Sequence, residues 1–151
     1  MAQLWRVVKR QHAATAFDGK AAQRFGGRWS SSGRPAVYAS ATKSLAMLEI
    51  LVHLDVGRPL PEFVAFSFDV DERLITRLAA RLPRNWRSAH GLLITRQIGD
   101  DWLASKQNLA LAVPSTIVPE EVNYLLNPVH PAFANLKLGR PQPFMLDPRL
   151  G

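Results

Sequence analysis

Cysteine is absent from the 151-residue chain. Without a thiol, the protein cannot build a disulfide framework, a cysteine-ligated zinc site, an iron–sulfur cluster or a thiol nucleophile. Long hydrophobic runs are also missing, because no stretch approaches the roughly 18 apolar residues of a membrane span. Charged residues occupy the amino-terminal segment, where a secretory signal would have its apolar centre. The sequence therefore predicts a cytoplasmic protein that does not enter the membrane.

Common nucleotide-binding and hydrolytic motifs are missing as well. There is no GxGxxG or Walker pattern, so neither a Rossmann nor a P-loop phosphate site is supported. No GxSxG pattern surrounds any serine, which argues against a hydrolase of that kind. Prolines and glycines are spread along the chain without a linker or an internal repeat. With 47% hydrophobic residues, the chain suits a single domain over residues 1–151.

The charge balance is basic, with a formal net charge of +7. Such a surface attracts anionic partners, which include nucleotide phosphates, nucleic acid and acidic proteins. The basic residues are scattered and form no nucleic-acid-binding tail. Arg73, Arg77 and Arg81 recur every four residues, and this spacing predicts a helix with the arginines along one face.

The remaining pattern predicts short strands and helices that alternate irregularly, which favours an α+β fold over a doubly wound sheet. A glycine- and serine-rich loop over 26–35 and a loop-rich segment over 117–133 are expected. Two further helices are expected, the first capped by Ser40 or Thr42, over 43–54 and 95–106. Strands are expected over 4–9, 36–40, 62–70 and 109–115, with short candidates near 136–139 and 143–146.

Glu49 is the most conspicuous single residue, because it interrupts a helical segment that otherwise has the composition of a buried helix. A carboxylate is rarely buried without a partner. It could be a functional group, or it could pair with His53 one helical turn away. A metal site on Glu49 and His53 would need a third ligand, and no spacing points to one, so we expect no metal.

Arg28, Tyr38 and Ser115 are ordinary when each is read alone. Arg28 lies in the glycine-flanked loop, where backbone without side chains can approach a ligand closely. Tyr38 lies in the middle of an expected strand, and Ser115 lies at the end of another.

Taken together, the segments resemble a known family. The stretch GGRWSSSGRPAVYASATKSLAMLEILVHL, followed in order by GDDWL, VPS, NYLLNPVHP and DPRL, is similar to the RES domain, named for its arginine, glutamate and serine. The resemblance extends from Trp5 to Leu150. Ser30 departs from it, because asparagine is expected after GGRW.

The resemblance implies a fold like that of ADP-ribosyltransferases, with a split mixed or antiparallel β core flanked by short helices. It implies NAD+ as the substrate and cleavage of the bond between nicotinamide and ribose. Glu49 would stabilise the cationic sugar, Arg28 would hold the pyrophosphate and Tyr38 would face the nicotinamide. Ser115 would orient Glu49 or a ribose hydroxyl, Arg6 would contact phosphate, and His53 would tune Glu49.

The acceptor of the ADP-ribosyl group stays open. Transfer to water or phosphate would deplete NAD+, which we favour for a small chain, whereas transfer to a protein would make a mono-ADP-ribosyltransferase. The resemblance also implies a toxin paired with an Xre-type helix-turn-helix antitoxin that covers the active site. DNA would be reached only through this antitoxin, and the toxin could form a homodimer within the hetero-oligomeric complex.

Two other classes of function remain as alternatives. The positive charge would also suit a nucleic-acid-binding or RNA-cleaving toxin, although the chain has no RRM, KH, helix-turn-helix or zinc signature. A binding module would use Glu49 as a structural carboxylate. Binding of NAD+ without turnover would favour the module, whereas salt-dependent RNA binding with RNA cleavage would favour the RNA-cleaving toxin.

Overall fold

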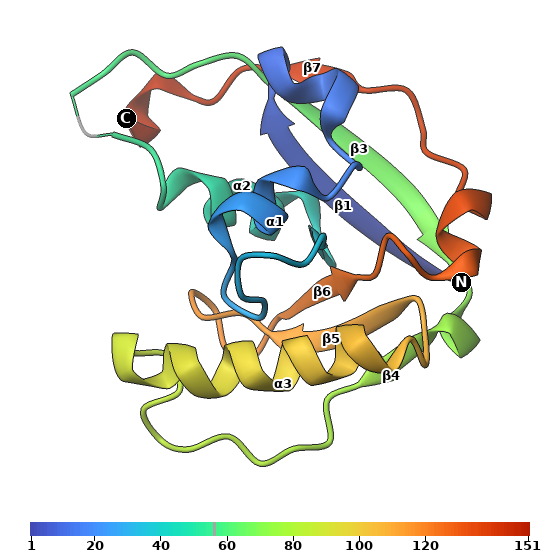
Figure 1. Cartoon of the computed structure of the whole chain (residues 1–151). Helices are drawn as coiled ribbons and strands as arrows, with labels where there is room; N and C mark the ends of the chain where they lie inside the picture. Colours follow the sequence, from blue (N-terminus) through green and yellow to red (C-terminus); the bar gives the residue numbers. More distant parts are fainter. Residues whose placement is uncertain (56) are drawn as a thin grey trace.

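The computed structural model describes residues 1–55 and 57–151, which form a seven-stranded mixed sheet with short helices packed on it (Figure 1). The strands are β1 (Ala2–Lys9), β2 (Val37–Ser40), β3 (Phe63–Val70), β4 (Ile75–Arg77), β5 (Ala110–Pro114), β6 (Val122–Leu126) and β7 (Gln142–Phe144). The α-helices are α1 (Lys20–Phe25), α2 (Lys43–Leu51) and α3 (Leu92–Ser105). Short 3-10 helices are η1 (Arg10–Thr15), η2 (Glu72–Leu74), η3 (Ala89–Gly91), η4 (Pro131–Asn135) and η5 (Pro148–Leu150). The α+β class expected from the sequence is confirmed.

The sheet has the strand order β4-β5-β6-β2-β1-β3-β7 and is weakly joined in its middle. β1 pairs with β3 over its whole length, from Ala2 opposite Val70 to Lys9 opposite Phe63. β2 pairs with β6 along all four of its residues. Between β1 and β2, the register over the described residues has a single pair, Trp5 opposite Ser40. The two halves of the sheet therefore diverge on one side of this pair, and we call this divergence the fork.

Helices α2 and α3 cover the same face of the sheet on the two sides of the fork. Side chains of β1 and β3, including Val7 and Ala65, pack with Ala46 of α2 in one apolar cluster. Leu111 and Leu125 pack with Trp102 of α3 in another. The opposite face is closed by a third cluster around Leu4, Val37, Phe68, Leu109 and Leu126. The fork is thus bordered by two independently packed helices.

Helix α2 begins at Lys43, directly after the residue that caps its amino terminus. The side chain of Thr42 accepts a hydrogen bond from the backbone N–H of Leu45, at 3.1 Å, so Thr42 and not Ser40 caps the helix. The helix ends at Leu51, three residues earlier than the pattern predicted. Its inner face buries Leu45 and Ala46, whereas Leu48 and Val52 on its outer side are exposed.

The helix expected around Arg73, Arg77 and Arg81 is wrong. This segment forms the one-turn helix η2 and then strand β4, which pairs in parallel with β5. The β-branched pair Ile75–Thr76 suits the edge of a sheet better than a helix. Arg73 lies in η2 and Arg77 lies in β4, so the three arginines do not share a helical face. Arg73 forms a local ion pair with Asp71 at 2.6 Å.

The segment over 117–133 is also more ordered than the expected loop. It contains β6, which lies between β5 and β2 near the middle of the sheet. A short strand that is buried on both faces shows a continuous apolar run rather than an alternating one, and this run is easily overlooked. The strand candidate near 136–139 is wrong, whereas the candidate at 143–146 corresponds to β7, which begins at Gln142 and ends at Phe144.

The other predicted elements are confirmed within a few residues. They are β1, β2, β3, β5 and α3, although α3 begins three residues earlier than expected, at Leu92. Across the described part of the chain, no helix combines the length and the apolar character that a membrane span requires.

Candidate functional site

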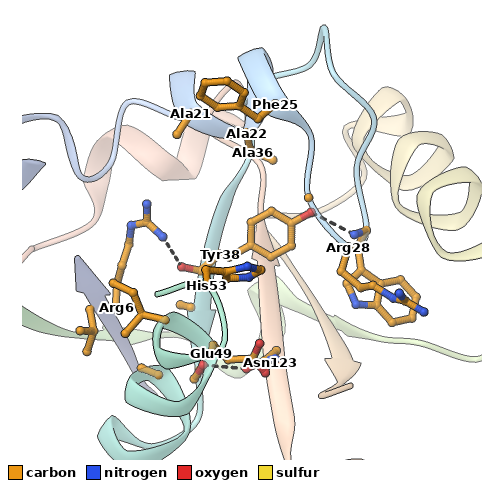
Figure 2. A pocket seen from close by; sticks show the side chains of 18 of the residues that line it. Arg6, Ala21, Ala22, Phe25, Arg28, Ala36, Tyr38, Glu49, His53 and Asn123 are labelled. Carbon is orange, nitrogen blue, oxygen red and sulfur yellow. Dashed lines mark hydrogen bonds between the residues drawn. The ribbon is translucent and has the colours of Figure 1, made fainter. Parts of the chain in front are cut away.

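A cavity of about 570 Å³ opens at the fork of the sheet. Its walls come from β1, β2, α1, α2, the loop after α1 and the beginning of β6 (Figure 2). The volume falls within the roughly 300–1,000 Å³ of small-molecule sites. Of the sequence-predicted site residues, five line this cavity: Arg6, Arg28, Tyr38, Glu49 and His53. The structure therefore brings together residues that are as far apart in the sequence as Arg6 and His53.

Glu49 faces the cavity from α2 and is held by two side chains beneath it. Its Oε1 accepts a hydrogen bond from Ser115 Oγ at 2.7 Å and another from Asn123 Nδ2 at 2.7 Å. Among the described residues, neither a hydrogen bond nor an ion pair reaches Oε2 from the protein. One oxygen of the carboxylate is thus anchored, and the other remains available to a ligand in the cavity.

Ser115 is completely buried and is not part of the cavity wall. Its hydroxyl donates to Glu49 and accepts hydrogen bonds from the backbone N–H groups of Ile117 and Val118, at 3.0 and 3.1 Å. Because the two N–H groups occupy the acceptor sites of the Ser115 hydroxyl, its single proton is free to point to the carboxylate of Glu49. Of the two roles expected for Ser115, the geometry matches the orientation of Glu49.

Arg6 bridges the fork from β1. Its Nε donates to the carbonyl oxygen of Ala16 at 2.6 Å, and its Nη1 donates to the carbonyl oxygen of Tyr38 at 2.8 Å. The guanidinium thereby satisfies a β2 carbonyl where β1 has diverged. Burial lowers the pKa of Arg6 to about 10, and Asp18 opposes this shift. The side chain is therefore still a cation at neutral pH.

Arg28 is fastened to a neighbouring loop. Its Nη2 donates to the carbonyl oxygens of Trp86 and Ser88, and the latter contact measures 3.1 Å. Its Nε is buried and has no hydrogen-bond partner among the described residues. Burial lowers the pKa of Arg28, and repulsion from the positive charge of Arg96 lowers it further. Arg28 thus lines the cavity with part of its donor capacity unused.

The loop that carries Arg28 is fixed to α3 through its backbone. Thr95 Oγ1 donates to the carbonyl oxygen of Arg28 at 2.6 Å, and Arg96 Nε donates to that of Gly27 at 2.9 Å. The carboxylate of Asp100 accepts from both the backbone N–H and the hydroxyl of Ser31, at 2.9 and 2.6 Å. Helix α3 therefore holds the loop in place, although it contributes no side chain to the cavity wall among the described residues.

Tyr38 lies in the wall with its hydroxyl turned toward the same loop. The hydroxyl accepts from the backbone N–H of Trp29 at 3.1 Å and shares a hydrogen bond of 2.7 Å with Ser30 Oγ. Ser30, the residue that departs from the family pattern, is completely buried and makes this contact. A Cβ on Gly27 would lie 2.5 Å from the Tyr38 hydroxyl oxygen, so the glycine permits this approach.

Replacing Tyr38 with phenylalanine is expected to lower the free energy of unfolding by about 1–3 kcal/mol, because it leaves buried polar groups unpaired. Burial raises the pKa of Tyr38, so the folded protein favours the neutral phenol. The Tyr38 hydroxyl contributes fully to the free energy of unfolding below a pH of about 10, which is the pKa of tyrosine in the unfolded chain. This contribution is lost as the pH rises through the higher pKa that Tyr38 has in the folded protein. Denaturation of both proteins from pH 7 to 11 tests this, and a difference that stays constant across the range would contradict it.

His53 follows α2 and is exposed at the cavity. Neither a hydrogen bond nor an ion pair joins it to Glu49 in the described structure. The alternative in which Glu49 pairs with His53 is therefore not seen, and Ser115 and Asn123 hold the carboxylate. Within residues 1–55 and 57–151, no three side chains of the metal-binding types gather closely enough to hold an ion. Glu49 and His53 thus find no third ligand in that part of the chain.

Asn123 was not identified from the sequence. It lies in β6 directly opposite Ser40 of β2, and its Oδ1 accepts from Ser40 Oγ at 2.6 Å. Pairing of these strands is a long-range property, so no local pattern marks either residue as part of the site. Two signals were available, because Asn123 is a polar residue within the otherwise apolar run VNYLL and begins the segment NYLLNPVHP of the family resemblance.

Comparison with known proteins agrees with the resemblance seen in the sequence. The model of the RES domain matches residues 3–147. A protein of Yersinia enterocolitica named Toxin Res is 42% identical over 149 residues, which cover 97% of this chain and 98% of that protein. A Sphingobium protein named Prs ADP-ribosylating toxin is 35% identical over 152 residues, covering 97% and 94% of the two chains.

A third relative, named Toxin Res, comes from Pseudomonas putida. It is 36% identical over 156 residues, which cover 97% of this chain and 98% of that protein. The family model and these relatives span nearly the same residues, including both halves of the sheet and the cavity between them. The chain belongs to the RES domain family.

Proposed function

We propose that this protein is a toxin that cleaves the bond between nicotinamide and ribose in NAD+. The observation that carries the proposal is the carboxylate of Glu49, anchored through Oε1 and open through Oε2, at a cavity of about 570 Å³ with two arginines in its wall. The names of relatives that match almost the whole chain support the toxin class.

The chemistry requires stabilisation of positive charge. Nicotinamide leaves as a neutral molecule, so the departing group needs no strong acid, whereas the ribose develops oxocarbenium character. A fixed carboxylate facing the sugar stabilises this charge without having to reorganise during the reaction. Glu49 takes this role through Oε2, which can also accept a hydrogen bond from a ribose hydroxyl.

The arginines supply the complementary charge for the pyrophosphate. Arg6 is held rigidly by two carbonyl oxygens, and its charge lies at the fork. Arg28 lines the wall of the same cavity, and its guanidinium could donate charge-assisted hydrogen bonds to a phosphate oxygen. Tyr38, whose hydroxyl is engaged by Trp29 and Ser30, presents its ring to the nicotinamide.

Two acceptors of the ADP-ribosyl group are considered. Transfer to water or inorganic phosphate would deplete NAD+, and we favour it because the cavity is built within one small domain. Transfer to a protein is the second candidate, and the name of the Sphingobium relative, Prs ADP-ribosylating toxin, favours it. We further propose an ADP-ribosyltransferase-like fold, in which the fork corresponds to the expected split in the β core.

Regulation by a partner completes the proposal. We propose a cytoplasmic complex with an Xre-type helix-turn-helix antitoxin, which covers the cavity and is the route to DNA. Phe25 is 71% exposed at the cavity mouth, and the net charge of +7 would suit an acidic inhibitory segment. A homodimer of the toxin within that complex is part of the same proposal.

Purified protein is expected to release nicotinamide from NAD+, and the dependence on added inorganic phosphate identifies the acceptor. A rate that rises with phosphate indicates phosphorolysis, and a phosphate-independent rate indicates hydrolysis. If release appears only after addition of cell lysate, with label from NAD+ found on a protein, the acceptor is a protein. Absence of release under all three conditions from folded protein, together with RNA cleavage, would overturn the proposal in favour of an RNA-cleaving toxin.

A further inference from the structure

We propose that Asn123 is a positioning residue for the carboxylate of Glu49, and that Ser40 supports the amide of Asn123 from its other end. This inference rests on the proposed function for its effect on catalysis. It depends on two hydrogen bonds. Ser40 Oγ donates to Asn123 Oδ1 at 2.6 Å, and Asn123 Nδ2 donates to Glu49 Oε1 at 2.7 Å.

The register of three strands creates the arrangement. Trp5, Ser40 and Asn123 are direct partners across β1, β2 and β6. Side chains of opposite residues in antiparallel strands point to the same face, and α2 covers that face. Asn123 therefore lies under Glu49 because of where the strands pair.

The amide has one orientation that satisfies both neighbours. Ser40 is buried at 3% exposure, and its hydroxyl donates to Oδ1. Nδ2, which carries two protons and accepts nothing, then faces the carboxylate. In the flipped orientation, Oδ1 would face Glu49 Oε1, and two acceptors would lie in hydrogen-bond contact without a proton between them. Glu49, which can only accept, thus selects the orientation of the amide, and the Ser40 hydroxyl donates to the oxygen at the other end.

The consequence is a distinction between the two carboxylate oxygens. Asn123 and Ser115 both donate to Oε1, so the carboxylate cannot rotate without breaking two charge-assisted hydrogen bonds. Oε2 is then held toward the cavity. In this arrangement Ser115 fixes the carboxylate from the end of β5, and Asn123 fixes it from β6 beside the cavity.

Asn123→Asp tests the proposal, because it keeps the shape and the acceptor for Ser40 but removes the donor to Glu49. We expect kcat for nicotinamide release to fall about 10- to 100-fold, with KM for NAD+ changed less than about threefold because the pyrophosphate contacts remain. Asn135→Asp, at an exposed position of helix η4, makes the same change in charge and should leave both constants unaltered. Ser40→Ala should lower kcat by about two- to fivefold and provides a second variant if Asn123→Asp does not fold.

The pH dependence adds a readout that simple damage to the fold would not produce. The ratio of kcat for Asn123→Asp to that of wild type should rise as pH falls from 8 to 5, because a proton shared between the two carboxyl groups restores a donor. Arg6, Asp18, Arg28, Tyr38 and His53 line the same cavity, and their titration largely cancels in the ratio. A flat ratio, or a loss confined to KM, would overturn the inference.

A spectroscopic measurement separates this inference from the proposed function. One side-chain amide proton of Asn123, assigned by its disappearance in Asn123→Asp, should resonate downfield in wild type and move upfield in Glu49→Ala. If both amide protons of wild type have ordinary shifts, the positioning role is wrong. If the downfield proton is present and wild type releases no nicotinamide, the positioning role stands and the NAD+-cleaving function fails.

Discussion

Replacing Glu49 with glutamine is expected to reduce the rate of nicotinamide release by about 100- to 1,000-fold, the range typical of losing one preorganised electrostatic group. The amide oxygen of glutamine can still accept from Ser115 and Asn123, as Oε1 does now. The amide nitrogen then takes the place of Oε2 and presents protons to a sugar that is becoming positive. The shape of the site is retained, and its electrostatic effect is reversed.

The measurement is nicotinamide release under saturating NAD+, with thermal unfolding of the same preparations. Glu120→Gln is the matched control, because Glu120 is exposed on the segment between β5 and β6 and is not part of the cavity wall. The control should be as active as wild type. If Glu49→Gln retains more than about a tenth of the activity while unfolding normally, Glu49 is not the stabilising group.

Replacing Gly99 with alanine is expected to destabilise the protein by about 3 kcal/mol, at the upper end of overpacking effects. A Cβ at this position would overlap the carbonyl oxygen of Trp29. The obstacle is backbone, which cannot move aside as a flexible side chain would. Trp29 itself is 2% exposed, so the loop that carries Arg28 would have to separate from α3.

Helix propensity alone predicts the opposite sign, because alanine is favoured over glycine by about 1 kcal/mol inside a helix. Thermal unfolding decides between the two. A loss of about 3 kcal/mol lowers the Tm by roughly 6–12 °C for a chain of this size. Ala104→Gly, at an exposed position of the same helix, measures the propensity effect separately. A Tm for Gly99→Ala that equals or exceeds that of wild type would show that the close approach of loop and helix contributes nothing.

The elements that sequence reasoning identified share a strong local pattern. The runs over 4–9 and 62–70 are rich in β-branched and aromatic residues, and the segment 43–54 has helix formers after a threonine cap. The segment around Arg73 misled because arginines four apart imitate a helical face, whereas pairing of Ile75–Arg77 with β5 decided its structure. Tertiary pairing overrode the local spacing there.

The same reasoning explains which site residues were found. Glu49 was visible because a charge within an apolar helix contradicts its surroundings, whereas Arg28, Tyr38 and Ser115 are ordinary alone and were identified through the resemblance to the family. Ser40 contradicts nothing locally and was considered only as a helix cap, and Asn123 is marked locally only as a polar residue in an apolar run. Their importance depends on the register between β2 and β6, which is fixed by contacts between segments 83 residues apart. Such information is absent from any short window of sequence.

The anchoring of Glu49 also determines when the site can exist during synthesis of the chain. The two donors to Glu49 come much later in the chain: Ser115 follows it by 66 residues and Asn123 follows it by 74 residues. While the ribosome has made β1, β2, α2 and β3, the carboxylate lacks both of its donors, because β5 and β6 have not yet joined the sheet. Long-range strand pairings of this kind form after local structure. A nascent or truncated chain therefore carries the charged residue without the geometry, and the proposed activity would arise only once β5 and β6 have joined the sheet.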